Sequence, residues 1–101
     1  MKKFTSDYPT REMNELFEAI LRLKSTDESA RFFRDLLTIT ELKEFANRWQ
    51  AVKMLIQGKS YTMIAAKLGM STATVTRVAQ WLHHGMGGYQ ILANRLFPKK
   101  Q

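Results

Sequence analysis

Apolar residues recur at helical spacing along most of this chain, and the breaks between these runs predict about six helices. Pro9, Gly58, the run Gly85–Gly88 and Pro98 punctuate the pattern. No segment alternates with the period of two that is typical of a strand. We expect helices over residues 11–24, 25–37, 38–57, 61–82 (a pair of helices) and 89–97. The sequence therefore predicts an all-α fold in one domain spanning residues 1–101, with residues 1–9 as a flexible arm and 98–101 as a basic tail.

Two capping boxes mark helix starts. Ser25 precedes Glu28 by three residues, and Thr38 precedes Glu41 by three, so each hydroxyl and carboxylate can satisfy free backbone N–H groups. The helix that begins near Thr38 is the longest and the expected spine of the fold. Its apolar side chains, more typical of a core than of a cofactor site, are Leu42, Phe45, Ala46, Trp49, Val52 and Ile56, with Leu55 beside them.

Residues 61–82 have the spacing of a helix-turn-helix. Ala65 stands where two helices would cross, and Gly69 can adopt the left-handed backbone of a tight turn. Ser71 is a good N-cap for the second helix, and Val75 would pack that helix onto the first. The remaining core positions are Ile64, Leu68, Met70 and Val78. The pattern favours a DNA-binding unit, and the alternative is a helical hairpin that only packs.

The second helix of this pair has three sides when stepped at about 100° per residue. Val75, Val78, Ala79 and Leu82 share the buried side. Opposite them lie Ala73, Thr76 and Gln80, with Arg77 at the edge; these small polar groups could approach base edges in a DNA groove. Thr74, Arg77 and Trp81 line a third side. We expect phosphate contacts from Ser71, Thr72, Lys67 and Lys59.

Charge is divided unequally along the chain. All nine acidic residues lie at or before Glu44, so residues 1–44 carry a net charge of −1 with their eight basic residues. Residues 45–101 carry eight basic side chains and no acidic one. A basic half that contains the helix-turn-helix favours binding to a phosphate backbone, whereas the alternative is a basic surface that serves only solubility.

Several other chemistries find no support in the sequence. The chain has no cysteine, so disulfides and thiolate metal sites are excluded. His83 and His84 are adjacent and would point about 100° apart on a helix, so they would not chelate one metal together. No phosphate loop, nucleophile motif or carboxylate pair indicates an enzyme, a cofactor or a catalytic residue. No apolar run follows Lys2 and Lys3, and no segment is long enough to cross a bilayer, so we expect a cytoplasmic protein.

The run LLTITELKEFANRWQAVKMLIQGKSYTMIAAKLGMSTATVTR, residues 36–77, resembles the Trp repressor superfamily, especially its Trp-repressor-related members of the YerC/YecD type. The motif combines Thr38, Arg48, Gly58, Gly69, Thr74 and Arg77, and the resemblance covers roughly residues 10–97. It implies an intertwined all-helical homodimer that presents two recognition helices to a two-fold-related operator. The wide apolar faces of the first helices also favour a dimer.

The resemblance also implies a possible effector pocket. In relatives that bind free tryptophan, two arginines and two threonines surround the ligand, at positions that match Arg48, Arg77, Thr38 and Thr74. Here, however, Trp81 replaces a serine that meets the ligand's amino group, Val78 replaces a glycine beneath the ring, and Asp35 replaces a nearby leucine. The link between the two helices of the motif is also one residue shorter. We therefore predict no response to L-tryptophan.

Trp81 suggests why no free indole would be needed. We predict that Trp81 lies in or against the pocket, with Arg77 one turn before it and able to stack on its ring. The resemblance implies that Arg48 of the long helix faces the same edge. The alternative is ordinary packing of Trp81 in a dimer core. The functional prediction is a sequence-specific DNA-binding transcriptional regulator, a repressor by resemblance. The alternatives are a protein- or RNA-interaction module, and a regulator with an unidentified small-molecule effector.

Overall fold

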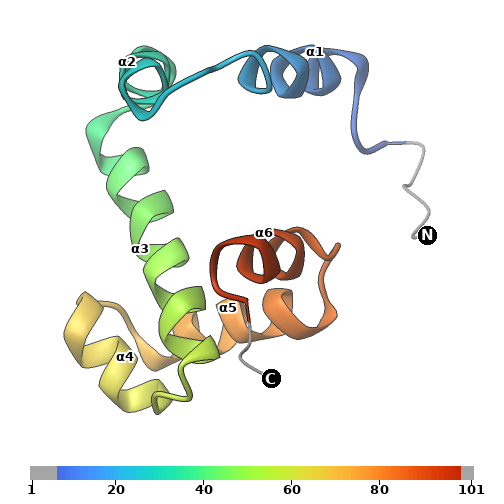
Figure 1. Ribbon diagram of the computed structural model, residues 1–101. Helices are drawn as coiled ribbons and strands as arrows, with labels where there is room; N and C mark the ends of the chain where they lie inside the picture. Colours follow the sequence, from blue (N-terminus) through green and yellow to red (C-terminus); the bar gives the residue numbers. More distant parts are fainter. Residues whose placement is uncertain (1–6, 99–101) are drawn as a thin grey trace. The chain divides into compact units, whose positions relative to one another are not determined.

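The computed structural model describes residues 7–98, and every regular element in that range is an α-helix (Figure 1). The helices are α1 (Arg11–Ile20), α2 (Thr26–Leu36), α3 (Ile39–Ile56), α4 (Tyr61–Leu68), α5 (Thr72–His84) and α6 (Gly88–Leu96). This confirms the predicted all-α fold of about six helices. Most of the predicted N-terminal arm and of the basic tail lies outside the described residues. No described helix is long and apolar enough to cross a membrane.

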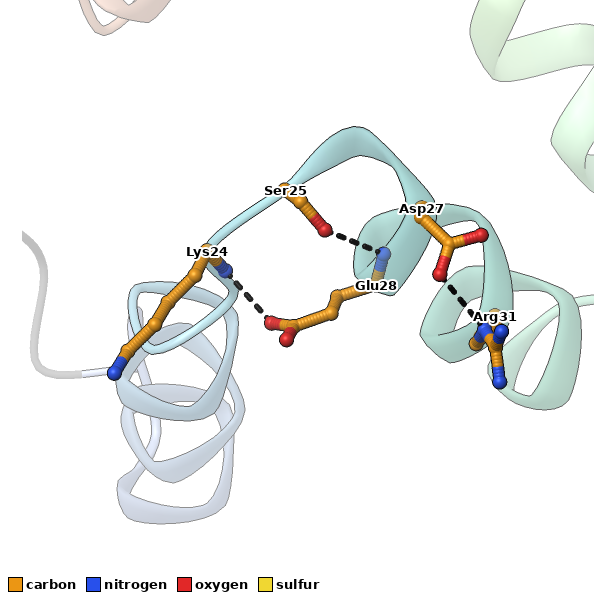
Figure 2. A network of polar contacts seen from close by, with 5 residues as sticks. All are labelled: Lys24, Ser25, Asp27, Glu28 and Arg31. Carbon is orange, nitrogen blue, oxygen red and sulfur yellow. Dashed lines mark hydrogen bonds and ion pairs between the residues drawn. The ribbon is translucent and has the colours of Figure 1, made fainter.

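The chain forms two compact units, Met1–Leu42 and Lys43–Gln101, and the division falls within α3. In the first unit, α1 ends at Ile20, four residues before the predicted end at Lys24. The reason is the cap of the following helix. Ser25 Oγ accepts a hydrogen bond from the Glu28 N–H, and the Glu28 carboxylate accepts one from the Lys24 N–H at 2.9 Å (Figure 2). Residues 24 and 25 therefore belong to the start of α2, and before them the N–H groups of Arg22 and Leu23 donate three residues back, to Ala19 and Ile20, which ends the regular α-helix.

The first unit has almost no core of its own. Neither α1 nor α2 contains a buried residue. On α1, Met13 and Phe17 are exposed, and Leu21 directly after it is 80% exposed. An apolar helix face gains stability only when something covers it, and within this unit much of the hydrophobic surface stays uncovered.

The helix α3 begins and ends as its sequence predicts. Thr38 Oγ1 accepts from the Glu41 N–H at 3.1 Å, and the Glu41 carboxylate accepts from the Thr38 N–H at 2.9 Å, which completes the capping box. These hydrogen bonds favour the ionised carboxylate and hold the pKa of Glu41 below its ordinary value. At the other end, Gly58 adopts a φ of 82°, and the Lys59 N–H donates to the Met54 carbonyl.

The buried face of α3 agrees with the predicted one only in part: Val52 is buried, and Trp49 and Leu55 pack against the core as predicted. Ala51, Val52 and Met54 are buried, whereas Phe45, Ala46 and Ile56 are exposed. The C-terminal half of α3 packs in the second unit, whose core joins residues of α3, α4 and α5. Because two helices pack on this half of α3, they cover a wider arc than the single stripe that periodicity predicts.

The helix α6 completes the second unit by packing on α5 (Figure 1). Its Gln90 side chain donates a hydrogen bond to the Leu82 carbonyl at 3.1 Å. The ring of Trp49 on α3 lies 6.2 Å from that of Tyr89 and 6.0 Å from that of Phe97, measured between centroids. These contacts hold the C-terminal end of α5 against α3 and α6.

Candidate nucleic-acid interface

The turn between α4 and α5 has helix-turn-helix geometry built from local hydrogen bonds. Ser60 caps α4 by accepting from the Met63 N–H at 3.1 Å. Gly69 ends α4 with a φ of 66°, a backbone conformation that favours glycine. The N–H groups of Gly69 and Met70 both donate to the Ala65 carbonyl. The chain therefore reverses within three residues, between Leu68 and Thr72.

Apolar side chains lock the two helices together. Ile64 of α4, Val75 and Val78 of α5 and Val52 of α3 are fully buried in one cluster. Ala65 is buried, and Leu68 and Met70 pack against the cluster from its edge. All the core positions predicted for the motif are thus in this cluster or against it. Such close packing resists rotation of α5 about its own axis, because rotation would expose its valines.

One polar contact that sequence reasoning missed also holds the motif. The Asn47 amide of α3 donates to the Leu68 carbonyl at the end of α4, at 3.3 Å. It satisfies a carbonyl that has no partner within its own helix. A single asparagine on a long helix belongs to no sequence pattern that predicts a partner. Its role is identified only by the packing of the end of α4 beside it.

The start of α5 is held by three hydroxyl groups. Ser71 Oγ accepts from the Thr74 N–H at 3.1 Å and lies 2.9 Å from Thr74 Oγ1. Thr76 Oγ1 donates to the Thr72 carbonyl at 2.9 Å. With its proton used in this way, the Thr76 hydroxyl is free to accept a hydrogen bond, as from an adenine or cytosine amino group, and its methyl group can contact thymine.

The side chains expected to face DNA lie together on the surface. Ala73, Thr76, Arg77 and Gln80 are exposed on the side of α5 opposite its buried residues. Ser71 and Thr72 are exposed at its N-terminal end, and Lys59 and Lys67 are exposed on the loop before α4 and on α4. The structure therefore brings the eight predicted residues to the surface of one motif.

The charge of this surface is not neutralised by ion pairs. Among residues 7–98, both ion pairs that form lie in the first unit, between Arg11 and Glu15 and between Asp27 and Arg31 (Figure 2). The sequence has no carboxylate side chain after Glu44. Fixed positive charge without nearby carboxylates creates a positive potential that attracts polyanions.

The residues predicted to form an effector pocket are only partly assembled. The Arg48 guanidinium carbon lies 5.9 Å from the Trp81 ring centroid and 5.8 Å from that of Phe45. The cation recorded over the Trp81 ring is therefore Arg48 from α3, and not Arg77 as predicted. Helical geometry places Arg77 one turn before Trp81, and its side chain is exposed.

The other residues of that predicted pocket have structural roles. Val78 is fully buried in the core of the motif, and the Thr74 hydroxyl is bonded to Ser71. Thr38 belongs to the first unit, where its hydroxyl caps α3. Beside Trp81 lies an apolar cavity of about 480 Å³, lined also by Trp49, Met86, Tyr89 and Leu92, which sequence reasoning did not identify.

The two histidines remain on the surface at the end of α5. The ring centroids of His83 and His84 are 6.4 Å apart, with the rings nearly edge to face. Within the described residues, no group of three or more histidine, cysteine or acidic side chains is placed to hold a metal ion. The histidines instead line a shallow cavity of about 200 Å³ together with Tyr61, Thr76 and Gln80.

Known proteins are similar to this chain in sequence and in fold. The Trp repressor protein family model matches residues 11–96. The uncharacterized protein YerC of Bacillus subtilis (strain 168) is 40% identical over 86 residues, which are 85% of this chain and 83% of that protein.

Two crystal structures are similar over nearly the whole chain. A TrpR-like protein from Eubacterium eligens ATCC 27750 matches with a TM-score of 0.87 and 38% identity, covering 96% of this chain and 100% of that one. A putative Trp repressor from Staphylococcus aureus matches with a TM-score of 0.86 and 33% identity, covering 99% and 100%. The family model and these relatives match the chain, and α4 and α5 form a helix-turn-helix. The chain therefore belongs to the Trp repressor family.

Proposed function

We propose that this protein is a sequence-specific regulator of transcription that binds duplex DNA as a homodimer and represses the genes it controls. The helix α5 would enter the major groove, with Ala73, Thr76, Arg77 and Gln80 facing the bases. Ser71, Thr72, Lys59 and Lys67 would contact phosphates and fix the register. No catalytic step, metal or organic cofactor enters this proposal.

The observation that carries the proposal is the surface of α5. Its exposed side presents short polar groups and one arginine on a helix whose opposite side is locked into a core. A protein-binding surface would instead be enriched in Tyr, Trp, Leu or Met at its centre. On α5 itself, Trp81 is the one such residue, 43% exposed at the margin of this side, and Tyr61 of α4 lies beside Thr76 and Gln80. The arrangement suits a groove better than a protein partner.

Apolar exposure supports the homodimer. The helices α1 and α2 contain no fully buried residue within their own unit, and Ile91, Leu92 and Leu96 of α6 are about half exposed. A surface this apolar in a soluble protein is typical of an obligate interface, because its exposure to water is unfavourable. We infer that the predicted single domain is completed only when two copies associate.

The test is selection of bound fragments from a random pool of duplexes, followed by fluorescence anisotropy on the enriched sequence. We expect a two-fold-related site, and an affinity that falls steeply between about 50 and 200 mM salt as several phosphates are neutralised per dimer. Enrichment of no sequence, with binding as tight to single-stranded RNA as to the duplex, would instead support the alternative of an RNA-interaction module.

L-Tryptophan is not part of the proposal. Trp81 and the fully buried Val78 stand at the positions that differ from the tryptophan-binding relatives, and the Arg48 guanidinium already lies over an indole ring. Repression would then be controlled by the amount of this protein in the cell or by an effector other than L-tryptophan.

A further inference from the structure

A basic cleft lies between α3 and α4 in the second unit. Its volume is about 380 Å³, within the range of small-ligand sites, and its lining comes from α3, the loop after it and α4. No residue of α5 lines it, so the cleft lies apart from the side chains proposed to face the bases, while two of its lysines, Lys59 and Lys67, are also proposed phosphate contacts.

Three lysines from three different segments line this cleft. Lys53 comes from α3, Lys59 from the loop and Lys67 from the last turn of α4. Within residues 7–98, none of the three forms an ion pair. The Lys53 ammonium lies 5.8 Å from the Phe97 ring, a neutral partner that leaves its charge in place. Like charges that share one cleft repel one another, and a bound anion would relieve that repulsion.

The remaining lining indicates what the anion carries. Met54, Met63 and Leu68 form an apolar part of the cleft, and Gln50 and Gln57 add amide groups that can donate hydrogen bonds. Inorganic phosphate would use the lysines and leave the apolar part in contact with water. A phosphate ester would use both, because its organic part could cover the methionines while its oxygens contact the ammonium groups.

We propose that the cleft between α3 and α4 binds the phosphate group of an organic phosphate ester. Lys53, Lys59 and Lys67 hold its oxygens, and its organic part rests on Met54 and Met63. The same chemistry is available from two sources, a free phosphate ester in solution or the sugar-phosphate backbone of DNA that flanks the recognition helix.

The test uses the full chain with ¹³C-labelled methionine methyl groups and n-hexyl phosphate as the probe. Met54 and Met63 report on the cleft, whereas Met86 reports on the separate apolar cavity beside Trp81. We expect the probe to shift the Met54 and Met63 signals and to leave Met86 unchanged. It should bind at least about tenfold more tightly than inorganic phosphate, because its alkyl chain is partly buried.

Variants that remove one positive charge test whether the cleft lysines bind the phosphate group. Lys53→Gln and Lys67→Gln should each weaken hexyl phosphate binding by about two- to fivefold, the effect of losing one partly exposed ionic contact. Arg95→Gln removes the same charge from α6, outside the cleft, and should change nothing. Equal shifts at Met86, an unchanged affinity in both lysine variants, or no shift with saturating probe would each overturn the proposal.

A competition arm separates the two sources. If the natural ligand is the DNA backbone, the enriched duplex should displace hexyl phosphate from Met54 and Met63. If it is a free ester, duplex and probe should bind together, and Lys59 and Lys67 would then not be the phosphate contacts assigned to them above. The probe alone requires no DNA, so a positive result stands even if the proposed regulatory function fails.

Discussion

The contact between Arg48 and Trp81 should be part of what holds α5 in its DNA-binding orientation, and changing Trp81 tests this. The Arg48 guanidinium comes from α3 and lies 5.9 Å from the indole centroid. Because Trp81 is 43% exposed, the contact is at the weak end of the cation–π range, about 0.5–1 kcal/mol. If all of this energy reaches DNA binding, Trp81→Ser should weaken operator affinity roughly two- to fivefold.

A double-mutant cycle isolates the contact from other effects of the substitution. We expect Arg48→Gln to weaken binding in the unmodified protein and to cost less in a Trp81→Ser background, because its partner ring is then absent. Trp81→Phe should keep part of the contact, since phenylalanine also presents an aromatic face. Arg95→Gln provides the control for loss of one positive charge. The assay is fluorescence anisotropy on the selected duplex, at one salt concentration for all variants.

Added ligands complete this test. The unmodified protein should bind DNA equally well with and without L-tryptophan, and free indole should restore part of the affinity of Trp81→Ser by refilling the space of the ring. Additive effects of Arg48→Gln and Trp81→Ser, or an unmodified protein whose DNA affinity rises as L-tryptophan binds, would refute the reasoning. Lost affinity with no rescue by indole would favour ordinary packing of Trp81.

Three further outcomes follow from the same structure. Gln80→Ala should relax the sequence preference, at a cost of about 1–3 kcal/mol in binding free energy on the preferred site, whereas Lys67→Ala should weaken binding to all duplexes alike. If Lys67→Ala changed the sequence preference and Gln80→Ala did not, the orientation proposed for α5 on DNA would be wrong. Sedimentation equilibrium should give a dimer at micromolar concentration, and a folded monomer there would contradict the proposed interface. Thr38→Ala should destabilise the protein in urea unfolding, and by less at pH 3 than at pH 7. The pKa of Glu41 is lowered in the folded protein, so the stability that its carboxylate contributes is present at neutral pH and is lost as the pH falls through that lowered value. An equal loss of stability in Thr38→Ala at both pH values would exclude a contribution of the Glu41 carboxylate to the cap.

Local chemistry was predictable from the sequence. Ser25, Thr38 and Ser71 cap helices as expected, because a hydroxyl reaches an N–H three residues ahead whatever the rest of the chain does. Gly69 takes the left-handed conformation for an equally local reason. The valines of α5 were predictable because one helix has one buried side, and the exposed side followed from them.

Tertiary packing decided the remainder. Periodicity on α3 could not indicate that Phe45 and Ile56 stay exposed while Ala51 and Met54 are buried, because burial depends on which helices arrive and over what arc. The resemblance implied that Arg48 faces the edge that carries Trp81. Periodicity could not show that the Arg48 guanidinium meets the Trp81 ring, since side chains far apart in sequence meet only through the packing of α3 on α5. The lysines of the α3–α4 cleft come together for the same reason: the sequence alone determined their charge, and the fold determined that they share one site.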